Sequence, residues 1–211
     1  MLDLIKALEQ QVILPIIRLA EKQRCLTLCE LIHQSGFECI EITLTSPHAL
    51  ELISRLAEQG VTVGAGTVLT LADAKAAVQA GAQYLISPGL NAEIVGFALK
   101  NSLPYIPGVF TPSEVMQALA LGLTHLKLFP AEPLGTAHLK HFSGPFPQVK
   151  WFPTGGITFE RIPDYLAAGA FAVGQGTRLV SAQALADEDW GTIQGELASI
   201  HAQTQLWKVG P

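Results

Sequence analysis

The sequence has few of the features that mark membrane, secreted or nucleic-acid-binding proteins. Charged residues are only 15% of its 211 residues, the net charge is −5, and no run of basic residues occurs. The lack of a basic run argues against nucleic acid or an anionic membrane as a partner. No apolar run approaches the roughly 20 residues that span a bilayer. The first twenty residues also lack the pattern of a secretory signal, so we expect a cytoplasmic protein.

Cysteine is scarce as well. Cys25, Cys29 and Cys39 are an odd number of thiols and form no CxxC pair, which predicts buried free thiols in a reducing compartment. Apolar residues are 49% of the chain, as in a compact globule. There is no linker, low-complexity segment or sign of a second domain, so residues 1–211 are interpreted as a single domain.

Short apolar runs alternate with helix-length stretches along the whole chain. The pattern of strand then helix occurs eight times, which implies a parallel sheet with right-handed crossovers. Eight such units favour an α/β fold of the closed (β/α)8 TIM-barrel type, and a doubly wound open sheet is the alternative. The predicted strands are Val12–Arg18, Phe37–Thr43, Val61–Ala65, Tyr84–Ser87, Pro104–Pro107, His125–Phe129, Val149–Pro153 and Phe171–Gly174.

The ends of the predicted helices carry their own signals. Pro47 and Pro112 are expected at or near first helical positions, where a missing N–H costs little. Met1–Gln10 predicts an amphipathic helix that closes the bottom of the barrel, with Leu2, Ile5 and Leu8 on one side, and Leu185–Gln205 predicts one or two final helices. Ala72–Gln79 and Ser113–Leu121 are examples of the helices between strands. Glycines predicted to end helices are Gly36, Gly60, Gly81, Gly122 and Gly169.

Charged residues are rare near the carboxyl ends of the predicted strands, where the active site of such a barrel lies. Arg18 ends the first strand, Glu41 lies late in the second, and Lys127 lies inside the sixth. A lysine within a strand must be solvated, paired or discharged, because burying an unpaired ammonium costs several kcal/mol or more. Lys150 opens its strand and therefore lies at the opposite rim. Three charges converging on one rim indicate a site.

Two glycine-rich turns follow the seventh and eighth strands. They contain Thr154-Gly155-Gly156 and Gly176-Thr177. Glycine allows close approach of a ligand to the backbone, and a following helix presents free N–H groups, so these turns predict a phosphate site. Pro88 also falls at a strand end and is expected to line the pocket.

A lysine, a glutamate and a phosphate site together suggest a mechanism. A neutral amine attacks a ketone to form a Schiff base, which accepts the electrons released by carbon–carbon cleavage. A free lysine is neutral in only about one part in 2,500 at about pH 7. Desolvation and a nearby cation such as Arg18 would both lower the pKa of Lys127, whereas an ionised Glu41 would oppose the shift. Glu41 would move protons through a water.

Five motifs in order resemble the Schiff-base aldolases for 2-keto-3-deoxy-6-phosphogluconate (KDPG) and 4-hydroxy-2-oxoglutarate (KHG). The resemblance covers nearly the whole chain and implies a (β/α)8 barrel, usually a homotrimer, with no metal and no cofactor. It implies that Lys127 forms the Schiff base and Glu41 is the general acid/base. Thr67, Pro88 and Phe129 would bind the substrate, Thr67 at the pyruvyl group. Phosphate would bind at Gly155, Gly156, Gly176 and Thr177, with Thr154 close by. The motifs are Glu41-Ile42-Thr43-Leu44, Gly64-Ala65-Gly66-Thr67-Val68, Ser87-Pro88-Gly89, Lys127-Leu128-Phe129-Pro130-Ala131 and Pro153-Thr154-Gly155-Gly156-Ile157.

One position departs from the family pattern. Many gluconate-type members have an arginine that binds the substrate carboxylate where this chain has Thr45. The related 6-phosphogalactonate aldolases carry their arginine at the end of the first strand, where Arg18 stands. Arg18 is therefore the candidate carboxylate clamp, because a guanidinium binds a carboxylate with two parallel hydrogen bonds. The later motifs favour the gluconate substrate, and the galactonate epimer stays the alternative.

Other functions would use the same barrel differently. A phosphosugar isomerase or a thiamine-phosphate-synthase-like protein would need carboxylates that the strand ends lack. A metal-dependent aldolase would need a histidine cluster, and His138 and His141 are interpreted as solvated surface residues without a third ligand. A non-catalytic phosphometabolite-binding barrel is the alternative of another class, and the pairing of Lys127 with Glu41 argues against it.

Overall fold

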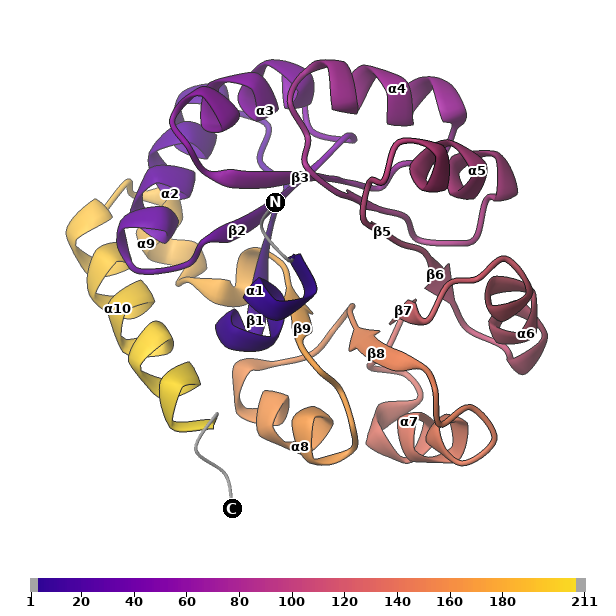
Figure 1. The fold of residues 1–211 in the computed structure, drawn as a ribbon. Helices are drawn as coiled ribbons and strands as arrows, with labels where there is room; N and C mark the ends of the chain where they lie inside the picture. The colour runs from indigo at the N-terminus through magenta and orange to yellow at the C-terminus, as the bar shows by residue number, and fades with distance from the viewer. Residues whose placement is uncertain (1–3, 208–211) are drawn as a thin grey trace.

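The computed structural model describes residues 4–207, which form a closed barrel of parallel strands surrounded by helices (Figure 1). The strands are β1 (Ile13–Ile17), β2 (Cys39–Thr43), β3 (Thr62–Gly66), β4 (Leu85–Ile86), β5 (Tyr105–Ile106), β6 (Gly108–Val109), β7 (His125–Leu128), β8 (Lys150–Pro153) and β9 (Val173–Gln175). The helices are α1 (Leu4–Gln11), α2 (Lys22–Gln34), α3 (Ala49–Glu58), α4 (Leu71–Gln79), α5 (Ala92–Lys100), α6 (Pro112–Ala120), α7 (Gly135–Ser143), α8 (Ile162–Ala167), α9 (Ala182–Ala186) and α10 (Trp190–Trp207), with short 3-10 turns η1 (Phe159–Arg161) and η2 (Thr177–Leu179).

Two sheet segments make up the barrel. One has the order β5-β4-β3-β2-β1-β9 and the other β6-β7-β8. They join on one side through Pro107, which separates β5 from β6 and whose carbonyl accepts a hydrogen bond from the Lys127 N–H at 2.8 Å. On the other side, parallel bridges pair Trp151 with Ala170 and Thr154 with Gly174. The eight predicted strands and the barrel are therefore confirmed, the fifth strand being divided at Pro107.

The predicted signals at the helix ends agree with the structure. All five glycines predicted to end helices have positive φ angles. Pro112 begins α6 directly after its N-cap, Thr111, as predicted. Pro47 lies near the start of its helix, as predicted, because α3 begins at Ala49, after a left-handed His48 with a φ of 61°.

The apolar core has two layers, one inside the barrel and one between the barrel and its helices. The inner layer includes Leu14 of β1, Cys39 of β2, Tyr84 before β4 and Phe152 of β8. The larger outer layer takes the alternate strand residues together with the buried faces of the helices. Alternation of side chains along each strand therefore separates the two layers.

Helix α1 lies over the centre of the strand ring (Figure 1) and packs against the inner layer. Its buried face is Leu4, Ala7, Leu8 and Gln11. Of the predicted face, Leu8 is buried, and Ile5 is half-buried and packs against the inner layer, as predicted; Leu2 lies outside the described residues. As predicted, a helix closes this end of the barrel.

The Gln11 side chain fastens α1 to the strands. Its Nε2 donates to the carbonyls of Ile13 and Cys39, each at 2.8 Å, and its Oε1 accepts from the Cys39 N–H at 2.8 Å. A buried amide with these partners is satisfied and orients the helix.

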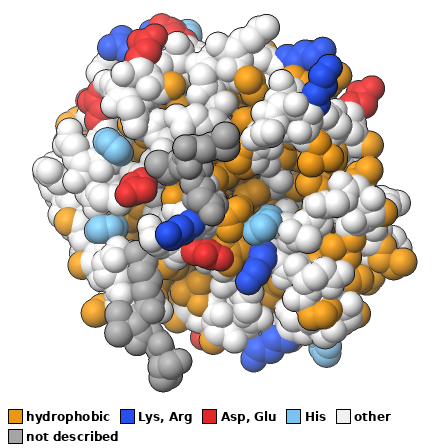
Figure 2. Space-filling model, in the orientation of Figure 1, with side chains coloured by type: hydrophobic (Ala, Val, Ile, Leu, Met, Phe, Trp, Pro, Cys, Tyr) orange, Lys and Arg blue, Asp and Glu red, His pale blue; other side chains and the backbone are white. Residues whose placement is uncertain are grey.

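The remaining surface features are simple. On the face drawn in Figure 2, which has the orientation of Figure 1, basic and acidic side chains are scattered among each other. None of the helices between residues 4 and 207 is both long and apolar enough to cross a membrane. The three cysteines are free and buried, as predicted. The predicted C-terminal helices are α9 and α10.

Candidate active site

A cavity of about 430 Å³ opens at the carboxyl ends of the strands. All the predicted site residues line it except Thr177, whose side chain is not among those that the structure describes. The barrel therefore brings together residues that lie far apart in the sequence. The lining residues are Ile16, Arg18, Glu41, Thr67, Pro88, Lys127, Phe129, Thr154, Gly155, Gly156, Ile157, Gly174, Gln175, Gly176 and Arg178.

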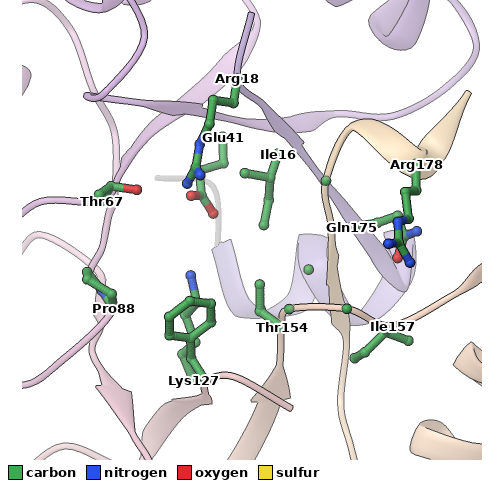
Figure 3. Close-up of a pocket in the computed structure, with 15 residues that line it drawn as sticks. Ile16, Arg18, Glu41, Thr67, Pro88, Lys127, Thr154, Ile157, Gln175 and Arg178 are labelled. Atoms are coloured by element: carbon green, nitrogen blue, oxygen red, sulfur yellow. The ribbon is translucent and has the colours of Figure 1, made fainter. Parts of the chain in front are cut away.

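Lys127 and Glu41 point into this cavity from different strands (Figure 3). Lys127 lies on β7 and is 6% exposed, and Glu41 lies on β2 and is 1% exposed. Burial lowers the pKa of Lys127 below its ordinary value of 10.5; the charge of Glu41 opposes this shift and that of Arg18 adds to it. Burial raises the pKa of Glu41 above 4.5, and the charges of Lys127 and Arg18 oppose that shift. Both groups are therefore moved toward their neutral forms.

The Glu41 carboxyl occupies space that a neighbouring glycine leaves open. Gly66 lies on β3 beside Glu41, and a Cβ built on it would lie 1.7 Å from Oε1 of Glu41. The other oxygen, Oε2, is buried without a hydrogen-bond partner among the described residues. Thr154 Oγ1 and Gln175 Oε1 are likewise buried and unpartnered. Unsatisfied buried polar atoms around a cavity are a feature of functional sites.

The Lys127 ammonium also lies against an aromatic face. Its Nζ is 5.0 Å from the centroid of the Phe129 ring. A cation at this distance is attracted to the ring, which fixes the direction of the lysine side chain within the cavity.

Arg18 and Thr45 differ clearly in position. Arg18 follows β1, lines the cavity, and points toward Glu41 and Lys127 in Figure 3. Thr45 is exposed and does not line the cavity; its hydroxyl donates to Thr43 Oγ1 at 3.3 Å. Of the two, only Arg18 can reach a ligand in the cavity.

The backbone around the cavity is held in unusual conformations. Thr67 has a φ of 57°, which is costly for a β-branched residue and is seen mostly where function requires it. Gly155 and Gly156 have φ angles of 101° and 77°, which glycine adopts without strain. The turn after β8 therefore presents its backbone to the cavity.

Five lining residues were not predicted. Ile16 and Ile157 are apolar and gave no chemical signal, and Gly174 was not singled out from the glycine-rich end of its strand. Gln175 and Arg178 flank the glycine turn at residue 176, and a polar and a charged residue so close to a predicted phosphate turn could have identified them.

The interpretation of the histidines on α7 is partly wrong. His141 is exposed, as predicted. His138 is half-buried, with its ring centroid 4.3 Å from that of Phe142 and 6.2 Å from that of Phe110. Its position one turn before Phe142 on α7 turns it inward. Between residues 4 and 207, no three His, Cys, Asp or Glu side chains are grouped so that they could hold a metal ion.

Comparison with known proteins now identifies the family. The family described as KDPG and KHG aldolase matches residues 4–195. The 2-dehydro-3-deoxy-phosphogluconate aldolase of Pseudomonas aeruginosa is 38% identical over 185 residues, which are 86% of this chain and 84% of that protein. The chain belongs to the KDPG and KHG aldolase family. Its members are carbon–carbon lyases, and the chain is an enzyme of this class.

Solved structures agree with this assignment. A KDPG aldolase from Legionella pneumophila, with pyruvate captured as a covalent carbinolamine intermediate, has a TM-score of 0.86 and 34% identity, covering 93% of this chain and 97% of that one. The Zymomonas mobilis KDPG aldolase with 3-phosphoglycerate has a TM-score of 0.86 and 32% identity, covering 95% of both chains.

A galactonate-type structure is less similar. It has a TM-score of 0.82 but only 24% identity, covering 92% of this chain and 95% of that one. That likeness supports the fold alone, and the relatives of higher identity carry gluconate names.

Proposed function

We propose that this enzyme cleaves KDPG to pyruvate and glyceraldehyde 3-phosphate through a Schiff base on Lys127. The observation that carries the proposal is the buried Lys127 facing the buried Glu41, each shifted toward its neutral form. A neutral lysine is a nucleophile, and a protonated carboxyl can donate a proton, so both shifts favour the forms that iminium chemistry uses.

The steps follow from the positions of these groups. The amine of Lys127 attacks the keto carbon, and Glu41 donates its proton through a water to the carbinolamine hydroxyl, which leaves as water and gives an iminium ion and the Glu41 carboxylate. Glu41, acting through a water, removes the proton of the substrate hydroxyl. The bond between C3 and C4 then breaks, its electrons pass to the iminium as an enamine, and the aldehyde leaves. Protonation of the enamine and hydrolysis release pyruvate and restore the amine.

The rest of the cavity accommodates the two anionic groups of this substrate. Arg18 would bind the carboxylate beside the reacting carbon, and Thr67 would contact the pyruvyl group. Pro88 and Phe129 line the same end of the cavity. Phosphate would bind at Gly155, Gly156, Gly176 and Thr177, with Thr154 close by, where open backbone N–H groups favour an anion. Cleavage of KHG to pyruvate and glyoxylate is proposed as a second activity, because the family includes both substrates.

Trapping with borohydride tests the Schiff base. With pyruvate and borohydride, the enzyme is expected to gain one irreversible adduct at Lys127, located by peptide mass spectrometry. Lys127→Met is expected to lose the adduct and to lower kcat by about 10⁴-fold or more. Lys150→Met is the matched control, because Lys150 is exposed at the other end of the adjacent strand, opposite His125. An adduct on another lysine would refute the assignment.

The same experiment separates the competing functions. A non-catalytic phosphometabolite-binding barrel would bind phosphorylated ligands and form no adduct. A galactonate-specific enzyme would form the adduct but cleave the galactonate epimer faster. Rates with both epimers, measured on one preparation, decide the substrate.

We further propose that the enzyme is a cytoplasmic homotrimer. The three free buried thiols suit a reducing compartment. Several large apolar side chains are exposed, including Leu69, Leu99 and Met116 at 55%, 59% and 63%, which favours association of subunits. The number three is taken from the family resemblance, and light scattering measures it.

A further inference from the structure

Arg178 is a charged residue of the cavity that neither the sequence motifs nor the comparisons assign. It lies in η2, directly after β9, and lines the cavity. No carboxylate among residues 4–207 forms an ion pair with its guanidinium. The nearby Arg24 differs, because its Nε lies 2.7 Å from a Glu188 oxygen. Arg24 is therefore paired with a carboxylate, whereas Arg178 has no such partner among residues 4–207.

The position of Arg178 places that charge away from the reacting groups. In Figure 3, Arg178 stands with Gln175 and Ile157 on one side of the cavity, and Lys127 and Glu41 stand toward the other. A ligand whose keto carbon reaches Lys127 would extend past Thr154 toward Arg178. Arg178 therefore faces the distal end of the substrate, whereas Arg18 faces the end that carries the reacting carbon.

The glycine turn by itself is a weak site for a doubly charged group. It offers only neutral N–H donors, and a carboxylate lies beside it. A Cβ built on Gly156 would lie 2.5 Å from Cβ of Glu132 and 3.5 Å from its Oε2. Like charges repel, so a nearby cation would strengthen the binding of phosphate at this turn.

We propose that Arg178 determines specificity for a phosphate ester at the distal end of the substrate. Its planar fork of N–H donors matches the oxygens of a phosphate dianion, and it offsets the charge of Glu132. A substrate whose distal end has no phosphate cannot make this contact, so the arginine adds little to its binding. The inference rests on the proposed function, since it names the group that selects among substrates of that site.

The test compares KDPG with the same keto acid without its phosphate. Arg178→Met is expected to lower kcat/KM for KDPG by about 10- to 100-fold, and to change kcat/KM for the unphosphorylated acid by less than about threefold. Arg178→Lys is expected to restore part of the loss, because a lysine keeps the charge but not the fork. Arg55→Met, which removes an exposed arginine of α3 far from the cavity lining, is the control for net charge.

Equal losses on both substrates, or no loss on either, would overturn the role of Arg178. A direct titration with inorganic phosphate and with glyceraldehyde 3-phosphate keeps the result independent of turnover. Weaker binding to Arg178→Met than to the unaltered enzyme supports the inference, and equal binding refutes it. Borohydride trapping reports separately on the proposed function: failure to trap pyruvate would refute the Schiff base while leaving the phosphate titration to decide on Arg178.

Discussion

The two ends of the barrel are built from the same strands but differ in whether their buried polar groups have hydrogen-bond partners. At the amino end, α1 seals the interior with Leu4, Ala7 and Leu8, and the Gln11 amide has hydrogen-bond partners for both its oxygen and its nitrogen. At the carboxyl end, Glu41, Thr154 and Gln175 each leave a buried polar atom without a partner in the described part of the chain. The polar groups at the amino end find their partners within the protein, whereas those at the carboxyl end are available to a ligand.

The closed end of the barrel therefore serves stability, and the open end serves function. Apolar burial at the closed end favours folding. Buried, unpaired polar groups at the open end oppose it. Substitutions at the closed end should therefore lower the free energy of unfolding and spare the chemistry, whereas those at the open end should impair the chemistry without lowering the free energy of unfolding.

The largest expected effect is at the open end. Glu41→Gln keeps the shape of the side chain but removes its proton transfer, so kcat should fall by about 10²- to 10⁴-fold. Steady-state cleavage of KDPG measures the loss. A variant with kcat within about threefold of the unaltered enzyme would show that Glu41 does not carry the proton.

The Glu41 carboxyl should also make the free energy of unfolding depend on pH. Burial raises the pKa of Glu41 in the folded state above its ordinary 4.5. Its favourable contribution is therefore present below pH 4.5 and is lost as the pH rises through the raised pKa. Urea unfolding should show Glu41→Gln gaining stability over the unaltered enzyme as the pH rises from 4.5 toward the raised pKa of Glu41. Glu9→Gln, at an exposed site on α1, should show no such trend.

The next effect is at the closed end. Leu8 is fully buried in the inner layer, so Leu8→Ala should lower the free energy of unfolding by about 2–5 kcal/mol. Ile5→Ala, on the half-buried side of α1, should cost less than half as much. Urea denaturation measures both. A fall in kcat/KM that follows the loss of stability, at temperatures where the variant is folded, would contradict the separation of the two ends.

The smallest effect concerns the carboxylate clamp. Arg18→Ala should raise KM for KDPG by about 10- to 100-fold, because a charged hydrogen-bonding partner is lost. Thr45→Ala should change it by less than about twofold, because the exposed Thr45 lies outside the cavity. Equal, small changes in the two variants would rule out the clamp at Arg18.

Much of this arrangement could be predicted from the sequence. The alternation of strands and helices predicts the barrel, because each unit has its own apolar run and its own glycine end. The barrel rule then places Arg18, Glu41 and Lys127 at one rim.

Other features depend on contacts that a linear pattern does not contain. The inward turn of His138 follows from the packing of Phe142 and Phe110 around it. Arg178 gave no signal of burial or periodicity apart from its place beside the glycine turn, and the fold shows that η2 reaches the cavity.

The space left by Gly66 has a consequence for how this site can change. A methyl group at position 66 would meet Oε1 of Glu41, so the two positions share one volume. Substituting either one alone leaves a clash or a void, whereas a larger residue at 66 with a shorter one at 41 could fill it again. The two substitutions should be strongly non-additive. The sizes of the side chains at positions 41 and 66 therefore constrain each other, so a larger residue at 66 requires a shorter one at 41.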